Sequence, residues 1–266
     1  MNIVVCVKSV PLVEGVDLKV SGTDIAKETL KFAINEWDEY ALEEAVLLKE
    51  KLGGEVTVLT LTTPKQSKNI EQTLRECYAK GADNAIQLVD EIVDNLDPFA
   101  KSKILSKVIK GLSFDLVFTG VQASDDGCAQ IGPTVATLLG LPYVTLVTKL
   151  EILAGGKAAK VERELEEGFK QVVELPLPAL LTIQTGINVP RYAPFAKIRA
   201  AMKKEIKTLS LKDIGLDPAE VMGWKRASVA KMAIPVVERK TVIIRGSPEE
   251  EAAGLVSILR EKGFGG

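Results

Sequence analysis

The 266-residue sequence contains no histidine. Without an imidazole, the chain cannot build a serine–histidine or cysteine–histidine nucleophile pair, an imidazole-ligated metal site or a histidine-ligated haem. Its three cysteines, Cys6, Cys77 and Cys128, are too few and too widely spaced for a disulfide framework or a cluster site. We therefore expect no metal site, and much of hydrolytic catalysis is excluded before any motif is considered.

An excess of one charge is also missing, because 34 Lys and Arg stand against 36 Asp and Glu. A net charge of -2 argues against a general nucleic-acid binder. The longest uncharged stretch, residues 127–148, is long enough to span a membrane, but Gly and Pro interrupt it and several polar residues dilute it. We interpret it as a buried helix followed by a strand. No basic leader precedes the first apolar run, so we expect a cytoplasmic protein without membrane insertion.

The first half of the chain alternates strand and helix patterns. Short apolar runs predict buried strands at residues 3–7, 56–61, 85–89 and 116–119. Helical patterns occupy the intervals, from Asn35 as N-cap to the Gly53–Gly54 pair, and at residues 65–80, 98–110 and 128–139. Connections of this length imply parallel pairing with right-handed crossovers. The predicted fold is therefore α/β, a mostly parallel twisted sheet with helices on both faces, Rossmann-like and suited to an adenine nucleotide.

The pattern changes near Tyr143. Short β-prone segments at residues 144–147, 158–161, 171–173 and 179–183 are separated by turn signals and predict antiparallel hairpins. Beyond Pro190 no repeating unit is evident: a helical piece at 198–207, a strand at 241–244 and a helix at 248–262 are predicted. We expect residues 1–190 to form the nucleotide-binding domain and residues 191–266 an extended C-terminal arm that packs on another chain.

The loop from Gly120 to Gly132 carries the clearest functional signal. It leaves a predicted parallel strand and enters a helix, which is where open α/β sheets bind nucleotides. Free N–H groups at Ala129, Gln130 and Ile131 would hold a phosphate there. The spacing fits neither a Walker motif nor a dinucleotide fingerprint, so a tight structural turn remains the alternative.

Asp125 and Asp126 lie in this loop and would repel a phosphate. We expect them to bind ribose hydroxyls or backbone groups, or to cap the helix, because adjacent carboxylates rarely face one another across a substrate. A ligase or hydrolase acting on an adenylate would need a cationic phosphate clamp, and the sequence reveals none.

Other residues should reach the same edge of the sheet. Cys6 to Lys8 follow the first strand, Thr62 and Thr63 follow the second, and Asn35 opens the first helix. Each has an ordinary structural alternative: a buried thiol, a helix cap or a solvated amine. Together they outline an adenine and ribose crevice without a base and nucleophile pair, so we predict no catalytic residue.

Several separated motifs make the chain resemble the beta subunits of electron-transfer flavoproteins over essentially its whole length. The most specific is the run from Val161 to Val173, with its basic residue and acidic turn, followed by the Pro-led strand 178–182. Residues 35–45, 120–132 and 188–193 match as well.

The resemblance implies a subunit without activity alone, paired with a flavin-bearing alpha subunit and serving an acyl-CoA or hydroxy-acid dehydrogenase. In electron-bifurcating members NADH and ferredoxin join the circuit. By position, the nucleotide-binding residues would be Cys6, Asn35, Glu36, Trp37, Asp38, Thr62, Gly120, Val121, Gln122, Ala123, Ser124, Asp125, Asp126, Gly127, Cys128, Ala129, Gln130 and Ile131.

Two further surfaces follow from the resemblance. The family's partner-docking loop falls on residues 184–190 with Ile187 as an exposed apolar anchor, although a core position at a strand end is the alternative. The arm should wrap the alpha subunit through residues 236–244 and through the helix face of Ala252, Leu255, Ile258 and Leu259. A basic run, formed by Lys197, Arg199, Lys203, Lys204 and Lys207, is either a solvated face or a patch that steers an acidic partner.

The bound nucleotide is AMP in ordinary members and FAD in bifurcating ones. The AMP-type loop runs D-D-D-C-N-Q-T-G and the bifurcating type D-G-D-T-A-Q-V-G-P, and the loop here mixes the two. Its second half, Ala129 to Pro133, favours FAD, whereas its first half and Val121, where bifurcating members carry Arg, leave AMP open. We predict FAD. A stand-alone adenine-nucleotide sensor of the universal-stress type is the alternative function, but it gives no reason for the arm.

Overall fold

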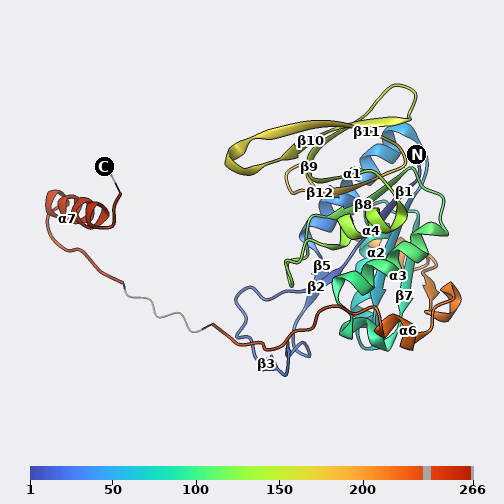
Figure 1. Cartoon of the computed structure of the whole chain (residues 1–266), viewed down its shortest axis with the longest axis horizontal. Helices are drawn as coiled ribbons and strands as arrows, with labels where there is room; N and C mark the ends of the chain where they lie inside the picture. Colours follow the sequence, from blue (N-terminus) through green and yellow to red (C-terminus); the bar gives the residue numbers. More distant parts are fainter. Residues whose placement is uncertain (236–240, 265–266) are drawn as a thin grey trace.

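The computed structural model describes residues 1–235 and 241–264 and is built on a nine-stranded sheet (Figure 1). From edge to edge the strand order is β11-β10-β9-β12-β8-β1-β6-β7-β13. The strands are β1 (Ile3–Cys6), β6 (Val56–Thr62), β7 (Asn84–Val89), β8 (Leu116–Gly120), β9 (Tyr143–Ile152), β10 (Ala158–Glu164), β11 (Lys170–Pro176), β12 (Ala179–Ile183) and β13 (Lys207–Leu209). Two small antiparallel pairs accompany them: β2 (Ser9–Pro11) with β5 (Phe32–Ile34), and β3 (Val20–Ser21) with β4 (Asp24–Ile25).

Four helices cover the parallel part of the sheet. They are α1 (Glu36–Leu52), α2 (Ser67–Lys80, preceded by a 3-10 turn at Pro64–Gln66), α3 (Pro98–Lys110) and α4 (Ile131–Leu139). Alternate side chains of a strand point to opposite faces. On β1, Ile3 and Val5 pack with residues of α1 and α2, whereas Val4 and Cys6 pack with residues of α3 and α4. Helices therefore lie on both faces, and the predicted α/β class is confirmed.

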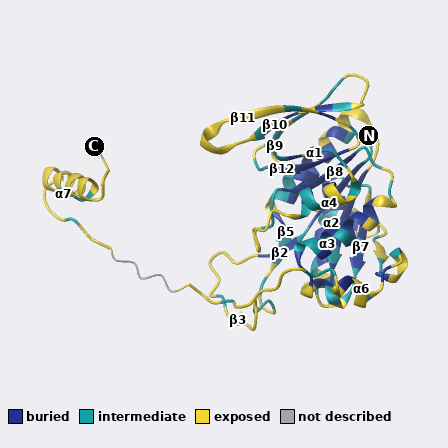
Figure 2. Cartoon of the chain, in the orientation of Figure 1, coloured by how far each residue is buried: buried dark blue, intermediate teal, exposed yellow. Residues whose placement is uncertain are grey.

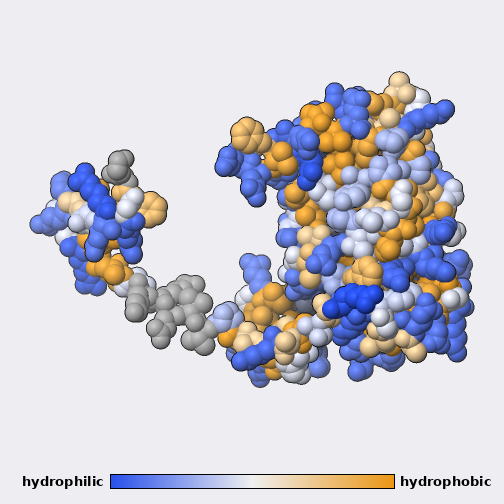
Figure 3. Space-filling model, viewed as in Figure 1, coloured by the Kyte–Doolittle hydropathy of each residue, from blue (hydrophilic) through white to orange (hydrophobic). Residues whose placement is uncertain are grey.

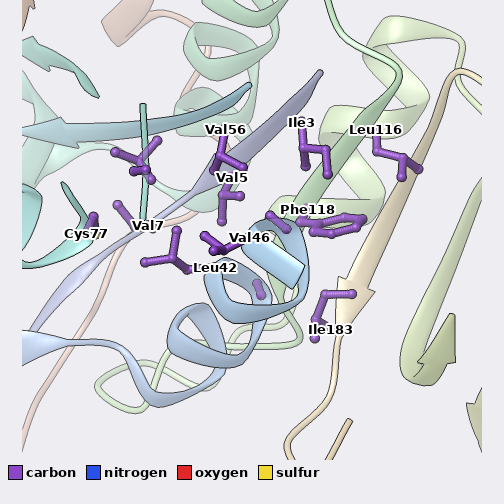
Figure 4. Close-up of a cluster of buried hydrophobic side chains, with 14 of the residues drawn as sticks. Ile3, Val5, Val7, Leu42, Val46, Val56, Cys77, Leu116, Phe118 and Ile183 are labelled. Atoms are coloured by element: carbon purple, nitrogen blue, oxygen red, sulfur yellow. The ribbon is translucent and has the colours of Figure 1, made fainter. Parts of the chain in front are cut away.

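The core beneath α1 illustrates this packing. Phe118 and Ile3 from neighbouring strands face Leu42 and Val46 of α1, with Ile183 beside them (Figure 4). All five are at most 1% exposed. Figure 2 shows the buried residues concentrated along the strands and the inner sides of the helices. The continuous apolar runs of the sequence are explained by this burial on both faces.

The strand order places a topological switch point between β1 and β8. Beyond β1 the chain moves to β6 and β7 in one direction, and α3 then carries it back past β1 to β8. Loops that leave the carboxyl ends of β1 and β8 therefore diverge toward opposite faces, and in open α/β sheets this is the place where a ligand crevice is expected.

The predicted antiparallel hairpins are confirmed for β9, β10 and β11 but are wrong for β12. Strand β12 pairs in parallel with both β8 and β9 and is buried along its whole length. The physical reason lies in its sequence, because Ala179–Ile183 is apolar except for Thr182 and suits a strand covered on both faces rather than a half-exposed hairpin.

Residues after Pro190 begin by packing on the sheet and helices. Helix α5 (Phe195–Ala201) contacts α2, and β13 extends the sheet beside β7. A 3-10 turn (Lys212–Ile214) and α6 (Pro218–Met222) follow, and Leu211, Leu216 and Val221 are buried against the α3 side. The helix predicted at 198–207 is α5, which is shorter and begins earlier. Lys207, the last residue of the predicted helix, instead starts β13.

Residues 241–264 do not pack on the sheet as residues 195–221 do. The strand predicted at 241–244 is wrong, since these residues have no regular secondary structure. Of the segment 236–244 that was predicted to wrap the alpha subunit, residues 236–240 lie outside the described ranges. The final helix is confirmed as α7 (Pro248–Glu261), which begins with a capping box between Ser247 and Glu250. No residue of α7 is buried, and the helix lies apart from the sheet (Figures 1 and 2). Apolar and polar side chains are both exposed on it (Figure 3).

Across the ranges described, no helix is long and apolar enough to cross a membrane. The uncharged stretch 127–148 divides into the end of a loop, α4 and the first residues of β9, as the helix-then-strand interpretation predicted.

Asp97 joins the C-terminal segment to α3 and allows a stability test. Its Oδ1 accepts the N–H of Ala100 (2.9 Å), and its Oδ2 accepts those of Arg226 (2.7 Å) and Ala227 (2.9 Å). Asp97→Ala should lower the free energy of unfolding by about 1–3 kcal/mol, because three N–H groups lose their acceptor. In urea denaturation, Asp217→Ala is the control, since it removes one exposed cap at Ala219 and should cost less. Equal losses in the two variants would contradict the assignment.

Candidate functional site

Asn35 holds the loop that follows β8. It precedes α1 as predicted, but its side chain does not cap the helix. Instead its Nδ2 donates to the carbonyl of Gln122 (2.8 Å), and its Oδ1 accepts the N–H of Ser124 (3.1 Å). The cap interpretation is therefore wrong for the side chain. Asn35 is buried, and an amide can donate and accept at once, which suits it to clamp a backbone segment.

Asp38 ties the ends of two strands together from the first turn of α1. Its Oδ2 accepts the N–H of Lys8 (2.8 Å), just after β1, and its Oδ1 accepts the N–H of Gly120 (3.0 Å), at the end of β8. Burial raises the pKa of Asp38 to about 7, because the desolvation of the carboxylate outweighs the N–H donors that favour its charge. This residue thus sets the separation of the two strand ends at the switch point.

Gly120 must be glycine because of this close approach. A Cβ on Gly120 would lie 2.5 Å from Asp38 Oδ1 and 2.5 Å from Trp37 Cβ. Trp37 in turn donates from Nε1 to Gln184 Oε1 (2.9 Å), on the segment after β12. The first turn of α1 therefore contacts both the loop after β8 and the predicted docking loop.

Lys8 neutralises the acidic pair of the loop. Its Nζ lies 2.5 Å from Asp125 Oδ1 and 2.8 Å from Asp126 Oδ2. Burial alone would lower the pKa of Lys8, but these two carboxylates outweigh it and raise the pKa. The ion pairs bridge the loops after β1 and β8, and they offset the repulsion that Asp125 and Asp126 would exert on a phosphate.

The turn into α4 leaves backbone donors available. The helix begins at Ile131, three residues later than predicted, because Ala129 adopts a left-handed conformation (φ 52°) that no α-helix contains. Within the described part of the chain, the N–H groups of Ala129, Gln130, Ile131 and Gly132 donate to no acceptor. Successive free N–H groups beside a left-handed residue are the kind of backbone arrangement that binds anions, and a phosphate contact here stays a prediction.

The ends of β1 and β6 contribute small buried groups. Burial, reinforced by Asp38, raises the pKa of Cys6 to about 12, so this thiol is a packing group rather than a nucleophile. The Thr62 hydroxyl donates to the carbonyl of Thr63 (3.4 Å). The Thr63 hydroxyl is buried and has no partner among the described residues. The sequence pattern could not show which of Thr62 and Thr63 would have the unpartnered hydroxyl.

Other predicted site residues are arranged as follows. Glu36 is exposed at the start of α1, and Ala123, Asp126 and Cys128 belong to the loop, where Gly127 donates to the Ala123 carbonyl (2.8 Å) and Cys128 N–H to Asp126 Oδ1 (3.0 Å). Val121 donates its N–H to the Ile183 carbonyl (3.2 Å).

The predicted docking loop is held firmly by α1. Asn188 Nδ2 donates to Glu44 Oε2 (3.0 Å), and Arg191 pairs with Glu43 (2.9 Å) and Glu50 (2.6 Å). Ile187 itself is half-buried and packs against the core beneath α1, so the expectation of an exposed side chain is wrong. Val189, two residues later, is 86% exposed.

The arrangement offers hydrogen-bond donors rather than a reacting pair of side chains. Free N–H groups and the unpartnered Thr63 hydroxyl lie at the carboxyl edge of a parallel sheet, which is where open α/β sheets bind their ligands. Both oxygens of its buried acid, Asp38, accept backbone N–H groups, so this carboxyl group serves structure rather than acid–base chemistry.

Comparisons with known proteins point to one family. The family described as "Electron transfer flavoprotein domain" matches residues 23–214. The chain is 38% identical over 263 residues to the electron transfer flavoprotein subunit beta of Methylophilus methylotrophus, with 98% of each chain covered. It is 40% identical over 267 residues to the same subunit of Clostridium acetobutylicum, with 99% of this chain and 100% of that protein covered. Against the caffeyl-CoA reductase-Etf complex subunit CarD of Acetobacterium woodii, identity is 37% over 267 residues, with 98% and 99% covered.

The buried acid predicts a pH dependence of stability. Because the folded chain keeps a proton on Asp38 up to about pH 7, whereas an unfolded aspartate releases it near its ordinary 3.8, the stability from this group is full below about pH 4 and is lost as the pH rises through 7. Asp38→Asn has no such proton, so the stability advantage of the natural chain over this variant should shrink between pH 5 and pH 8. Urea denaturation at both pH values measures it. Glu36→Gln, an exposed change in the same turn, should leave the profile unaltered, and an advantage that is constant or grows with pH would refute the prediction.

Proposed function

This chain belongs to the electron transfer flavoprotein family as a beta subunit, and we propose that it binds FAD at the crevice between β1 and β8. The observation that carries the proposal is the loop 120–131. Its acidic pair is neutralised by Lys8, and its free N–H groups stand at the start of α4. FAD can accept two electrons and release them one at a time, and the surrounding protein tunes how readily it does so.

Residues of this chain would bind FAD through backbone and packing more than through charged side chains. Cys6 and Asn35 would border the adenine half, and the orphaned Thr63 hydroxyl would meet a polar atom there. The N–H groups from Ala129 to Gly132 would hold the pyrophosphate, which explains how Ala is tolerated at 129, since its backbone makes the contact. The run Ala129–Pro133 favours FAD over AMP, the alternative nucleotide.

We further propose that the chain works as a heterodimer with an alpha subunit and serves a dehydrogenase. The unburied helix α7 supports the first part, because none of its residues is buried and Leu255, Val256 and Leu259 are each more than 40% exposed. The name of the relative CarD, a subunit of a caffeyl-CoA reductase-Etf complex, supports an acyl-CoA enzyme as partner, with a hydroxy-acid dehydrogenase as the alternative. If the nucleotide is FAD, the proposal includes NADH and ferredoxin as further redox partners. We place the heterodimer in the cytoplasm.

The docking loop would meet the dehydrogenase. Its pairing with Glu43, Glu44 and Glu50 of α1 presents a rigid surface with Val189 at its tip, while Ile187 would need to leave its half-buried position to act as an anchor. The basic run beyond it, including Lys197 and Arg199, would steer an acidic partner.

A stand-alone nucleotide sensor is not favoured. The matches to beta subunits cover 98–99% of this chain, including the arm after Pro190.

Nucleotide content tests the FAD assignment. The heterodimer, purified after co-expression with its alpha subunit and extracted by heat, should release about two FAD and no AMP, one flavin from each subunit. Chromatographic quantification measures both. One FAD with one AMP would overturn the FAD assignment and leave the family membership unaffected.

Residue-level changes in α7 test the pairing. Leu255 is 51% exposed on the apolar face of the helix, and Ser257 lies on the opposite face. Leu255→Glu should reduce co-purification with the alpha subunit at least about tenfold, because a charge replaces an apolar contact, whereas Ser257→Glu should leave it unchanged. A second variant lacks residues 228–266. This truncation keeps every buried position up to Val221 and the contacts of Asp97, so residues 1–227 should stay folded, whereas co-purification with the alpha subunit should be lost. Undiminished pairing of the truncated chain would contradict the role of the arm.

A further inference from the structure

Lys101 stands near the same crevice without an assigned role. It lies in the first turns of α3, which begins at the carboxyl edge of the sheet and packs beside α4. The side chain is half-buried, and within residues 1–235 and 241–264 its amine forms no ion pair or hydrogen bond. A half-buried amine without an acceptor is unusual, because the lost hydration is normally replaced by a carboxylate or carbonyl.

The charges around Lys101 do not provide that replacement. Asp125 and Asp126 are near enough to attract it, but both are already paired with Lys8, and Asp94 is exposed beyond ion-pair distance. Burial and the nearby charge of Lys8 together lower the pKa of Lys101. The two lysines therefore repel one another at a place where only one of them has a counter-ion.

An anion is the missing partner. The free N–H groups of Ala129 to Gly132 open α4, the helix that packs on α3, so they and the Lys101 amine belong to the same edge of the sheet. Backbone donors and an amine together bind phosphate more strongly than either alone, because the hydrogen bond from a charged donor is the stronger kind.

We propose that Lys101 binds the phosphate group of the adenine nucleotide, while Lys8 keeps Asp125 and Asp126 neutralised beside it. This inference rests on the proposed function and adds a specific ligand to that site. It also supplies the cationic phosphate clamp that the sequence did not reveal.

The experiment compares ligands that differ only in phosphate. Equilibrium dialysis of the full-length chain, freed of nucleotide, measures the affinity for FAD, AMP and adenosine. Lys101→Met keeps the length of the side chain and removes its charge. It should weaken FAD and AMP binding on the order of tenfold or more and change adenosine binding less than about twofold, because only the phosphate meets the amine. Lys107→Met, an exposed change on the same helix, is the matched control and should alter none of the three.

Lys101→Arg serves as the second variant, because it keeps the charge and should retain affinity for FAD and AMP within about threefold. Equal losses for adenosine and AMP in Lys101→Met, or an Arg variant as weak as the Met variant, would show a structural role and overturn the inference. Unchanged FAD and AMP affinity in Lys101→Met would overturn it as well. If the natural chain bound neither FAD nor AMP, the nucleotide function itself would fail, which is a distinct result.

Discussion

The carboxylate of Asp38 is the constraint on which the site depends. It lies inside the protein and accepts N–H groups from the ends of β1 and β8, the two strands where the sheet changes direction. A buried carboxyl group without hydrogen-bond partners would be costly, so these hydrogen bonds hold α1 and both strand ends in one geometry. The close contact at Gly120 follows from this, as does the position from which the loop after β8 begins.

Charge balance decides the shape of that loop. Asp125 and Asp126 would repel one another and any phosphate, yet Lys8 contacts both and draws the loop toward the end of β1. The same first turn of α1 that carries Asp38 also carries Trp37, which is hydrogen-bonded to Gln184. The loop 120–132 and the predicted docking loop 184–190 therefore share one support, the first turn of α1.

Much of the fold was predictable from hydrophobic patterning. Helix α3 matches its predicted bounds, and the parallel strands differ from theirs by one residue at an end, because burial on both faces imposes a continuous apolar run. Predictions failed where pairing partners are distant in sequence. Strand β12 was assigned to a hairpin although its neighbours are β8 and β9. Strand β13, which completes the sheet beside β7, was not predicted, and its first residue, Lys207, was taken as the end of a helix. Local residues carry no information about which edge a strand will join.

Local patterns were enough to predict the α/β class and the loop that carries the backbone donors, and several separated motifs were enough to identify the family. The roles of the polar side chains became visible only in the folded chain. Asn35 clamps a loop rather than a helix end, Lys8 pairs with the acidic residues, and Lys101 has no counter-ion among the residues that the structure describes. These roles depend on distances between segments separated by tens of residues, and the parallel sheet sets those distances by gathering the carboxyl ends of its strands at one edge.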